Sequence, residues 1–320
     1  MTEPEPLSAE ELTRHLHARG VLDAGATVTI EPLAGGVSGD VCAVAAPGVE
    51  AVVKRAHRQL RVAREWLADE DRLVTEGWAL RLAGDLIPGA VPRVLDLDPC
   101  TRTLVMERAP RDWRDWRAEL LAGRVDPAVG ERLGRLLRRW HDASAEQPRL
   151  LAAFADQTAF VQLRIDPFHR AVAARHPDLG GAIEAVAQRL LSERRCLVHG
   201  DFSPKNVLVG GDGAWVVDWE VAHVGAPVFD LAFLVCHLVL KSVHRPEQAA
   251  ACRETARRFL GGYGADAERD LAEHVACLLL ARVDGTSPAA YLTAAQQVRV
   301  RALGRRMLGS PAELNPFIHA

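Results

Sequence analysis

Two short apolar runs, at residues 207–209 and 215–217, flank the turn sequence Gly-Gly-Asp-Gly at 210–213. A glycine-rich turn between β-branched runs is typical of a β-hairpin. Because a hairpin folds back on itself, the residues just before and just after it are expected to lie side by side. Asn206 directly precedes this hairpin and Asp218 directly follows it. The sequence therefore predicts that these two side chains converge.

The segment that leads into the hairpin carries a third polar group. It follows the apolar run 196–198 and reads His-Gly-Asp-Phe-Ser-Pro-Lys-Asn at 199–206. Carboxylate and amide oxygens suit Mg²⁺, which would leave Asp201 to accept a proton from a hydroxyl group. A base, an asparagine and a second aspartate in this order form the catalytic half of a phosphoryl-transfer site of the protein-kinase type. Each carboxylate alone could merely cap a local turn, but the ordered set favours catalysis.

The motif His-Gly-Asp-x-x-x-x-Asn at 199–206, followed by Asp-Trp-Glu at 218–220, resembles the catalytic loop of the aminoglycoside phosphotransferase and choline kinase family. That family also includes homoserine kinases and methylthioribose kinases, and its members resemble protein kinases in fold. The resemblance implies an α+β fold of two lobes, a small antiparallel-sheet lobe and a larger, mainly helical lobe, with ATP between them.

The resemblance also implies roles for individual residues of the loop. Asp201 would be the catalytic base, and Asn206 and Asp218 would bind Mg²⁺. His199 would support the loop from within, and Asp230 would brace it from the start of the next helix.

Strand-like segments dominate the first hundred residues, namely 28–33, 40–45, 51–54, 92–97 and 103–107. The first two are joined by Ala-Gly-Gly-Val-Ser-Gly at 34–39, where glycines let a backbone approach a ligand closely and exposed amides can cradle phosphate. The resemblance places the nucleotide-covering loop here, at Gly36, Ser38 and Gly39. An ordinary flexible hairpin is the alternative.

A lysine at the end of an apolar strand, Lys54, is a candidate ligand for the ATP phosphates. The helical pattern at 69–83 supplies two possible partners, Glu76 and Glu70. Glu76 is preferred, because its spacing to Pro88 is similar to that of the helix glutamate in the family. The alternative is a lysine that reaches solvent or a surface ion pair of little energetic value.

The pattern changes from strand-rich to helix-rich near residue 108, which predicts a nucleotide-binding lobe at 1–107 and a helical lobe with the acceptor site at 108–320. The resemblance implies that the linker binds adenine through its backbone near Glu107 and Ala109. Helices are expected at 128–145, within 167–191, and at 231–243, 246–260, 265–280 and 288–308.

The acceptor site is predicted less sharply. Arg282 and Asp284 lie in a polar, turn-rich segment between helices, and Glu220 follows the metal-binding motif. These three are candidates for acceptor binding. The same segment could instead connect two helices, with Ser287 as N-cap and Pro288 as the first helical residue.

Composition excludes several classes of function. The chain has 39 basic and 42 acidic residues, without a long basic tract, so no nucleic-acid partner is expected. No apolar run is long enough to span a membrane, and the start of the chain lacks a signal-peptide profile. Six scattered cysteines indicate reduced thiols. A cytoplasmic monomer or homodimer is therefore expected.

Two kinds of acceptor remain open. The stretch from Val53 to Arg72 resembles the methylthioribose kinase branch, which favours a hydroxyl of a sugar-like or nucleoside-like molecule. The alternative is an antibiotic O-phosphotransferase of the aminoglycoside type, which would confer resistance. The segment 246–320 has eight acidic residues and nine arginines, a balance that does not favour a polycation. A nucleotide-binding pseudokinase is the third possibility.

Overall fold

The structure is a computed structural model that describes residues 8–33, 39–56, 71–264 and 270–310. The chain forms two compact units, Met1–Arg111 (the first unit) and Asp112–Ala320 (the second unit), and each is described by itself. The assignment of nucleotide binding to 1–107 and of acceptor binding to 108–320 stays a prediction.

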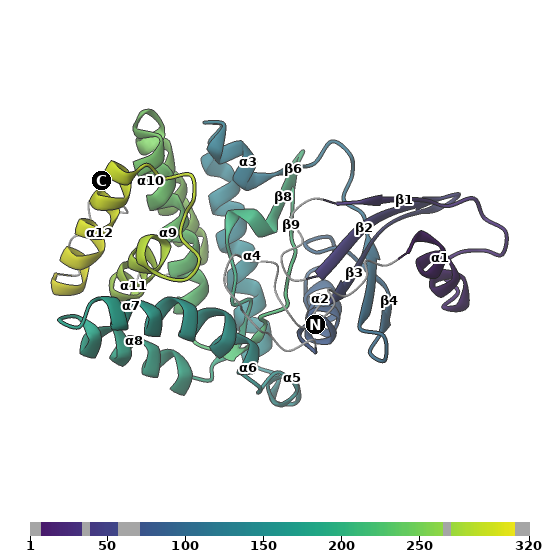
Figure 1. The fold of residues 1–320 in the computed structure, drawn as a ribbon, viewed down its shortest axis with the longest axis horizontal. Coiled ribbons are helices and arrows are strands. Elements are labelled where there is room, and N and C mark those ends of the chain that lie inside the picture. Colours follow the sequence, from purple (N-terminus) through teal and green to yellow (C-terminus); the bar gives the residue numbers. More distant parts are fainter. Residues whose placement is uncertain (1–7, 34–38, 57–70, 265–269, 311–320) are drawn as a thin grey trace. The chain divides into compact units, whose positions relative to one another are not determined.

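A five-stranded antiparallel sheet forms the centre of the first unit (Figure 1). Its order is β1-β2-β3-β5-β4. The strands are β1 (Thr29–Pro32), β2 (Gly39–Ala46), β3 (Val49–Ala56), β4 (Val94–Asp98) and β5 (Thr103–Glu107). Each overlaps a segment that the sequence predicts to be a strand, so the expected antiparallel sheet is confirmed.

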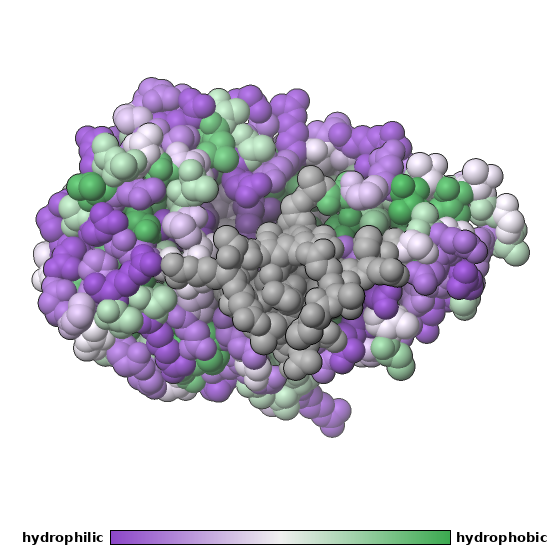
Figure 2. Space-filling view, viewed as in Figure 1, coloured by the Kyte–Doolittle hydropathy of each residue, from purple (hydrophilic) through white to green (hydrophobic). Residues whose placement is uncertain are grey.

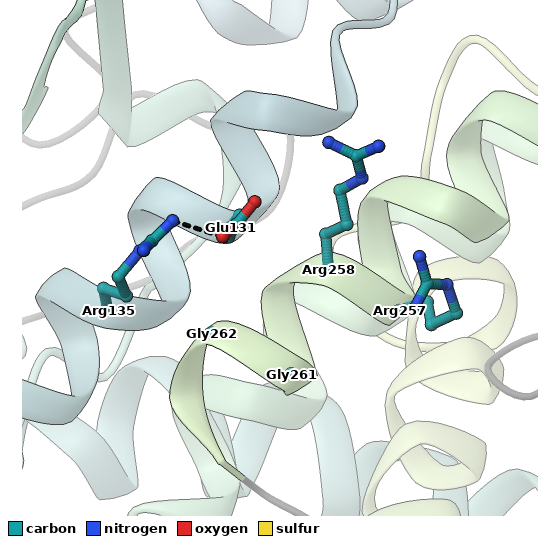
Figure 3. Close-up of a pocket in the computed structure, with 6 residues that line it drawn as sticks. All are labelled: Glu131, Arg135, Arg257, Arg258, Gly261 and Gly262. Atoms are coloured by element: carbon teal, nitrogen blue, oxygen red, sulfur yellow. Dashed lines mark hydrogen bonds and ion pairs between the residues drawn. The ribbon is translucent and has the colours of Figure 1, made fainter.

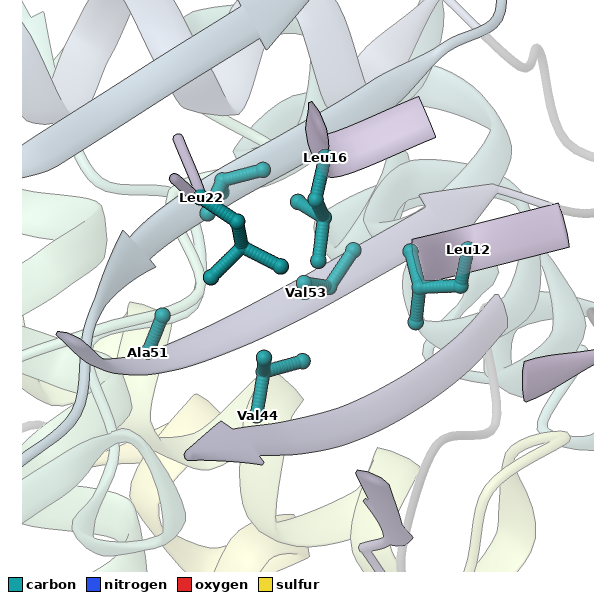
Figure 4. Packing of buried hydrophobic residues seen from close by; sticks show 7 residues of the cluster. Leu12, Leu16, Leu22, Val44, Ala51 and Val53 are labelled. Atoms are coloured by element: carbon teal, nitrogen blue, oxygen red, sulfur yellow. The ribbon is translucent and has the colours of Figure 1, made fainter. Parts of the chain in front are cut away.

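The helix α1 (Ala9–Ala18) covers one face of this sheet. Ser8 caps it by accepting a hydrogen bond from the amide of Glu11 at 3.1 Å. Leu12 and Leu16 of α1 are buried in one cluster with Val53 of β3 (Figure 4). Burying each leucine contributes about 1.5–3 kcal/mol, so this cluster fixes α1 on the sheet.

The helix α2 (Arg72–Leu86) lies against β3, β4 and β5. Side chains alternate between the two faces of a strand, so Lys54 points away from the face that buries Val53. The close approach of α2 depends on Gly77, where a Cβ atom would meet the side chain of Leu97 at 2.7 Å. The sequence predicts this helix at 69–83, of which residues 69 and 70 lie outside the described ranges.

The second unit is mainly helical. Its longer helices are α4 (Pro127–Ala145), the π-helix η1 (Val161–Arg170), α8 (Gly180–Ser192), α9 (Val228–His244), α10 (Ala249–Tyr263), α11 (Leu271–Asp284) and α12 (Ala294–Gly309). Its short helical segments are α3 (Trp116–Leu121), α5 (Pro148–Ala153), α6 (Thr158–Phe160), α7 (Ala171–Arg175), η2 (Pro204–Asn206) and η3 (Pro246–Gln248). Its strands are β6 (Arg114–Asp115), β7 (Cys196–Val198), β8 (Val207–Gly210), β9 (Gly213–Val216) and β10 (His223–Gly225). Together with the sheet of the first unit, they give the predicted α+β fold.

Two helices of the second unit pack with their backbones in contact. Cβ atoms added at Gly130 and Gly134 of α4 would lie 2.4 Å from the carbonyl oxygen of Thr255 and 2.1 Å from that of Phe259 in α10. A Cβ at Gly262 of α10 would lie 2.5 Å from the carbonyl oxygen of Glu131. Only glycine fits at these three positions, so the helix pair is specified by the sequence.

Two helix starts differ from the sequence prediction. The last helix was expected to begin at Pro288, but α12 begins at Ala294, where Thr293 and Gln296 form a reciprocal capping box. Pro167 was expected near the start of a helix, but it lies inside η1, which begins six residues earlier. A π-helix leaves its backbone wider than an α-helix does, which accommodates this proline.

Hydrophilic side chains cover most of the described surface in the view of Figure 2, with hydrophobic ones scattered among them. Among the described helices, none is both long enough and apolar enough to cross a membrane. All six cysteines are free thiols, and four of them are buried.

Candidate active site

The predicted hairpin forms, and it brings the two ends together. Strands β8 and β9 pair in antiparallel register with a two-residue turn, and Val217 donates its amide to the carbonyl of Asn206 at 2.9 Å. Asp218 is the next residue after Val217. Lys205 connects the loop to both carboxylates, since its Nζ lies 2.7 Å from Asp201 Oδ2 and 3.9 Å from Asp218 Oδ2.

Asp201 is almost fully buried, with 3% of its surface exposed. Arg164 Nη2 lies 2.9 Å from its Oδ2. Burial alone would raise the pKa of Asp201, but the charges of Arg164 and Lys205 outweigh it and hold the pKa below its usual value. The carboxylate is therefore ionised at neutral pH and can accept a proton.

Sequence reasoning missed Arg164. It lies in η1, 37 positions before Asp201, and it donates Nε–H to the carbonyl of Gly200 at 2.8 Å. Its guanidinium also lies over the rings of Phe168 and Phe233, 5.6 Å from each centroid. A π-helix often marks a functional position, but its wider hydrogen bonds leave no periodic pattern by which the sequence could have revealed it.

His199 organises the loop as a neutral ring. Its Nδ1 accepts the amide of Asp201 at 3.1 Å, and its Nε2 lies 3.0 Å from the carbonyl of Val217. Burial lowers the pKa of His199, which keeps the ring uncharged. One imidazole thus joins the start of the loop to the end of the hairpin.

Asp230 holds the same loop through its backbone. From the first turn of α9 it accepts the amides of His199 at 2.7 Å and Gly200 at 2.9 Å. His141 Nε2 of α4 lies 3.4 Å from Asp230 Oδ2, and His141 Nδ1 lies 2.9 Å from the hydroxyl of Tyr263. Asp230 is fully buried, and these partners keep its pKa below the usual value in spite of burial.

Two backbone positions explain residue choices in the motif. Gly200 has φ +75°, and a Cβ there would meet the carbonyl oxygen of Val221 at 2.6 Å. Asp218 has φ +69°, a conformation that aspartate tolerates better than most residues. Non-glycine residues held in this left-handed conformation, such as Asp218, cluster at functional sites.

Asn206 and Asp218 offer a donor set that fits Mg²⁺. Asn206 Nδ2 donates to the carbonyl of Asp201 at 3.0 Å, so Oδ1 is the atom of Asn206 that would bind a metal ion. In the described ranges, no group of three or more His, Cys, Asp and Glu side chains could hold a metal. One amide and one carboxylate suit an ion whose other ligands are substrate phosphates and water.

In the first unit, Lys54 forms an ion pair with Glu76 of α2. Its Nζ lies 2.6 Å from Glu76 Oε1, and the two side chains are 16% and 1% exposed. The helix residue preferred from the sequence is therefore the one in contact, whereas Glu70 lies outside the described residues. The role of this pair in nucleotide binding stays a prediction.

The other predicted nucleotide contacts are only partly described. Gly36 and Ser38 lie outside the described residues, and Gly39 opens β2. Glu107 ends β5, where its amide donates to the carbonyl of Arg93 at 2.9 Å. Ala109 follows in an irregular segment.

The three acceptor candidates lie in different surroundings. Asp284 accepts two hydrogen bonds of 2.7 Å from Arg301, and His176 Nε2 lies 3.0 Å away, so its carboxylate ties α11 to α12. Arg282, two residues earlier in α11, donates to the carbonyl and hydroxyl of Ser287. Glu220 lies in the turn after Asp218.

An open hollow of about 480 Å³ lies on the second unit between α4 and α10 (Figure 3). Its lining is Glu131, Arg135, Arg257, Arg258, Gly261 and Gly262. Arg135 is paired there with Glu131. None of these residues belongs to the loop 199–206 or to the hairpin that follows it, so the hollow is not part of the site above.

Solved structures share the fold. A choline/ethanolamine kinase family protein from Mesorhizobium loti aligns with a TM-score of 0.54 and 21% identity, covering 96% of this chain and 98% of its own. A spectinomycin phosphotransferase aligns with a TM-score of 0.56 and 13% identity, covering 97% and 100%. These likenesses confirm the expected kinase-like fold.

Relatives in sequence agree with the predicted branch. A methylthioribose kinase of Cronobacter sakazakii is 26% identical over 223 residues, which are 62% of this chain and 56% of that protein. The chain thus spans little more than half of the length of the methylthioribose kinases that it matches. The model of the phosphotransferase enzyme family matches residues 29–274, more than three quarters of the sequence. The chain therefore belongs to the phosphotransferase enzyme family.

Proposed function

We propose that the protein is an ATP-dependent kinase that transfers the γ-phosphoryl group to a hydroxyl of a small, sugar-like or nucleoside-like acceptor. One observation carries this proposal: Asp201 is buried and ionised between Arg164 and Lys205, on the loop that positions Asn206 and Asp218. Family membership supports it, as does the spectinomycin phosphotransferase of similar fold, which was solved with ADP and spectinomycin.

In this proposal each residue has one task. Asp201 orients the acceptor hydroxyl and takes its proton, while Lys54, held by Glu76, steadies the phosphates of ATP. Asn206 and Asp218 hold Mg²⁺, which when bound neutralises charge on the phosphate oxygens. The transition state is loose, so positioning and charge neutralisation contribute more than base strength.

Replacing the base tests the proposal. Asp201→Asn is expected to lower kcat by about 10²–10⁴-fold, because the amide cannot take the proton. Binding of Mg-ATP should persist. ADP formation measured across sugars, nucleosides and antibiotics gives kcat, and calorimetry gives the affinity for Mg-ATP.

A matched control is Asp212→Asn, at an exposed position in the hairpin turn. It should leave both quantities unchanged. Equal turnover of Asp201→Asn and the parent protein would remove Asp201 from the mechanism. A parent protein that neither binds Mg-ATP nor forms ADP with any acceptor would point to a non-catalytic member of the family.

A further inference from the structure

A buried lysine in the second unit, Lys241, has no anionic partner among the residues that the structure describes. Lys241 lies in α9 and is 1% exposed. Within the described ranges its Nζ has no hydrogen-bond partner and no carboxylate at ion-pair distance. It lies over the ring of Tyr291, 3.9 Å from the centroid. Burial, together with the positive charges of Arg282 and Arg117, lowers its pKa to about 7. A buried amine of this kind is rare unless something binds it.

Arg282 and Tyr291, beside Lys241, also have buried polar atoms without a partner. The Nε of Arg282 and the hydroxyl of Tyr291 are both buried atoms without a hydrogen-bond partner in the described part of the chain. Arg282 donates through Nη1 to Ser287, which orients the guanidinium and leaves Nε unused. Three donors from α9, α11 and the segment before α12 are therefore unsatisfied in one neighbourhood.

This neighbourhood is connected to the catalytic base along one face of α9. Phe233, His237 and Lys241 follow at intervals of four residues, so they share that face. The ring of Phe233 contacts the guanidinium of Arg164, which pairs with Asp201. The next residue along this face, His237, lies towards Lys241, and its ring centroid is 5.3 Å from that of Phe233.

The charges along this face of α9 also affect one another. Burial sets the pKa of His237 well below its usual value, and the charges of Arg282, Lys241, Lys205 and Arg117 lower it further. Burial also lowers the pKa of Arg282, and Asp201 is among the charges that oppose this shift. Basic side chains therefore gather on this side of α9, in a protein whose net charge is −3.

We propose that Lys241, Arg282 and Tyr291 form an anion-binding subsite for the acceptor, which would be a hydroxyl compound that also carries a carboxylate or phosphate. This inference rests on the proposed kinase function and narrows its substrate. Lys241 and Arg282, when protonated, repel a third positive charge, so the subsite selects against aminoglycosides and other polycations.

A purely structural role for Lys241 accounts for fewer of these observations than an anion-binding role does. Contact with the ring of Tyr291 accounts for where the ammonium lies. It provides no acceptor for the three N–H groups of the lysine, and it leaves the Tyr291 hydroxyl and Arg282 Nε unexplained. An anionic group bound among Lys241, Arg282 and Tyr291 would supply acceptors for these donors.

The first test compares hydroxyl compounds of different charge. D-glucose, D-gluconate, D-glucose 6-phosphate and the polycation kanamycin are assayed for ADP formation. The parent protein is expected to use an anionic member, gluconate reporting a carboxylate and glucose 6-phosphate a phosphate. Lys241→Met and Arg282→Gln should raise KM for that acceptor about tenfold or more, with little change in kcat. Arg258→Gln, an exposed arginine of α10, is the control and should change neither.

The second test needs no catalysis. Calorimetry measures binding of gluconate, glucose 6-phosphate and inorganic sulfate to the full chain without nucleotide. Binding by the parent protein that weakens about tenfold in Lys241→Met supports the subsite. If none of the three anions binds, or if Lys241→Met binds them equally well, the subsite is refuted.

The two proposals can fail separately. Phosphorylation of glucose or kanamycin that Asp201→Asn abolishes and Lys241→Met preserves would retain the kinase and overturn the anionic acceptor. Anion binding that depends on Lys241, without ADP formation from any acceptor, would retain the subsite and overturn the kinase.

Discussion

Arg164 is the residue on which the state of the proposed base depends most. It binds the carboxylate of Asp201 and the carbonyl of Gly200 with one buried guanidinium. Arg164→Gln removes the charge that lowers the pKa of Asp201, so that pKa should rise. The base is then ionised only at higher pH, and the acidic limb of the profile of kcat/KM against pH should move upward. The profile with any accepted substrate measures this shift.

Two variants make this result specific. Arg164→Lys keeps the charge but loses the forked geometry, so its acidic limb should match that of the parent protein while its kcat is lower than that of the parent. Arg170→Gln changes an exposed arginine of the same helix and should leave the profile unchanged. A profile that is identical in Arg164→Gln and the parent protein would mean that Arg164 has only a packing role.

At the scale of elements, the pair α4 and α10 offers the sharpest test of stability. Gly134→Ala places a Cβ 2.1 Å from the carbonyl oxygen of Phe259, and backbone on both sides prevents relief. The free energy of unfolding should fall by roughly 1–3 kcal/mol or more. Urea unfolding followed by circular dichroism measures it.

The control lies on the partner helix. Gly261 is exposed in α10, and a Cβ there would meet no atom within 4 Å. Gly261→Ala should therefore stabilise the protein by roughly 0.5–1 kcal/mol, because alanine favours helix. If both variants had the same effect, the close packing of these helices would not matter to stability.

Elements with a local sequence signal could be predicted from the sequence. The glycine turn predicts the hairpin β8–β9, the apolar run predicts the buried helix α9, and the apolar residues before Lys54 predict its strand. Elements that depend on contacts with distant residues could not be predicted. The signal Ser287-Pro288 is a plausible helix start, but the Ser287 carbonyl binds Arg282, and the capping box at Thr293 begins the helix instead. The roles proposed for Arg164 and Lys241 could not be predicted from the sequence, because both depend on contacts with residues that are distant in sequence.

At the scale of the whole molecule, three buried histidines make the second unit sensitive to acid. Burial lowers the pKa of His169 to about 4, of His223 to about 4 and of His274 to about 3. Unfolding returns each to about 6.5. Between these values the unfolded chain binds protons that the folded chain does not, so the free energy of unfolding decreases as pH falls from 6.5 towards 4.

Each unit of difference in pKa corresponds to about 1.4 kcal/mol per histidine, so the loss should be large. Urea midpoints at a series of pH values measure it. His274→Leu should flatten the dependence, whereas His17→Gln in the first unit should not. A midpoint that is constant over this range would contradict the buried, neutral state of these rings.

The ammonium of Lys205, shared between Asp201 and Asp218, has a consequence for how the site is kept ready. Two neighbouring negative charges would push the loop open, but here the polypeptide supplies its own counter-ion. The ordering of the loop is therefore completed during folding, and an arriving ligand does not have to contribute that entropy. A cation that enters this place must displace an ammonium group, so loading and release are an exchange of one positive charge for another.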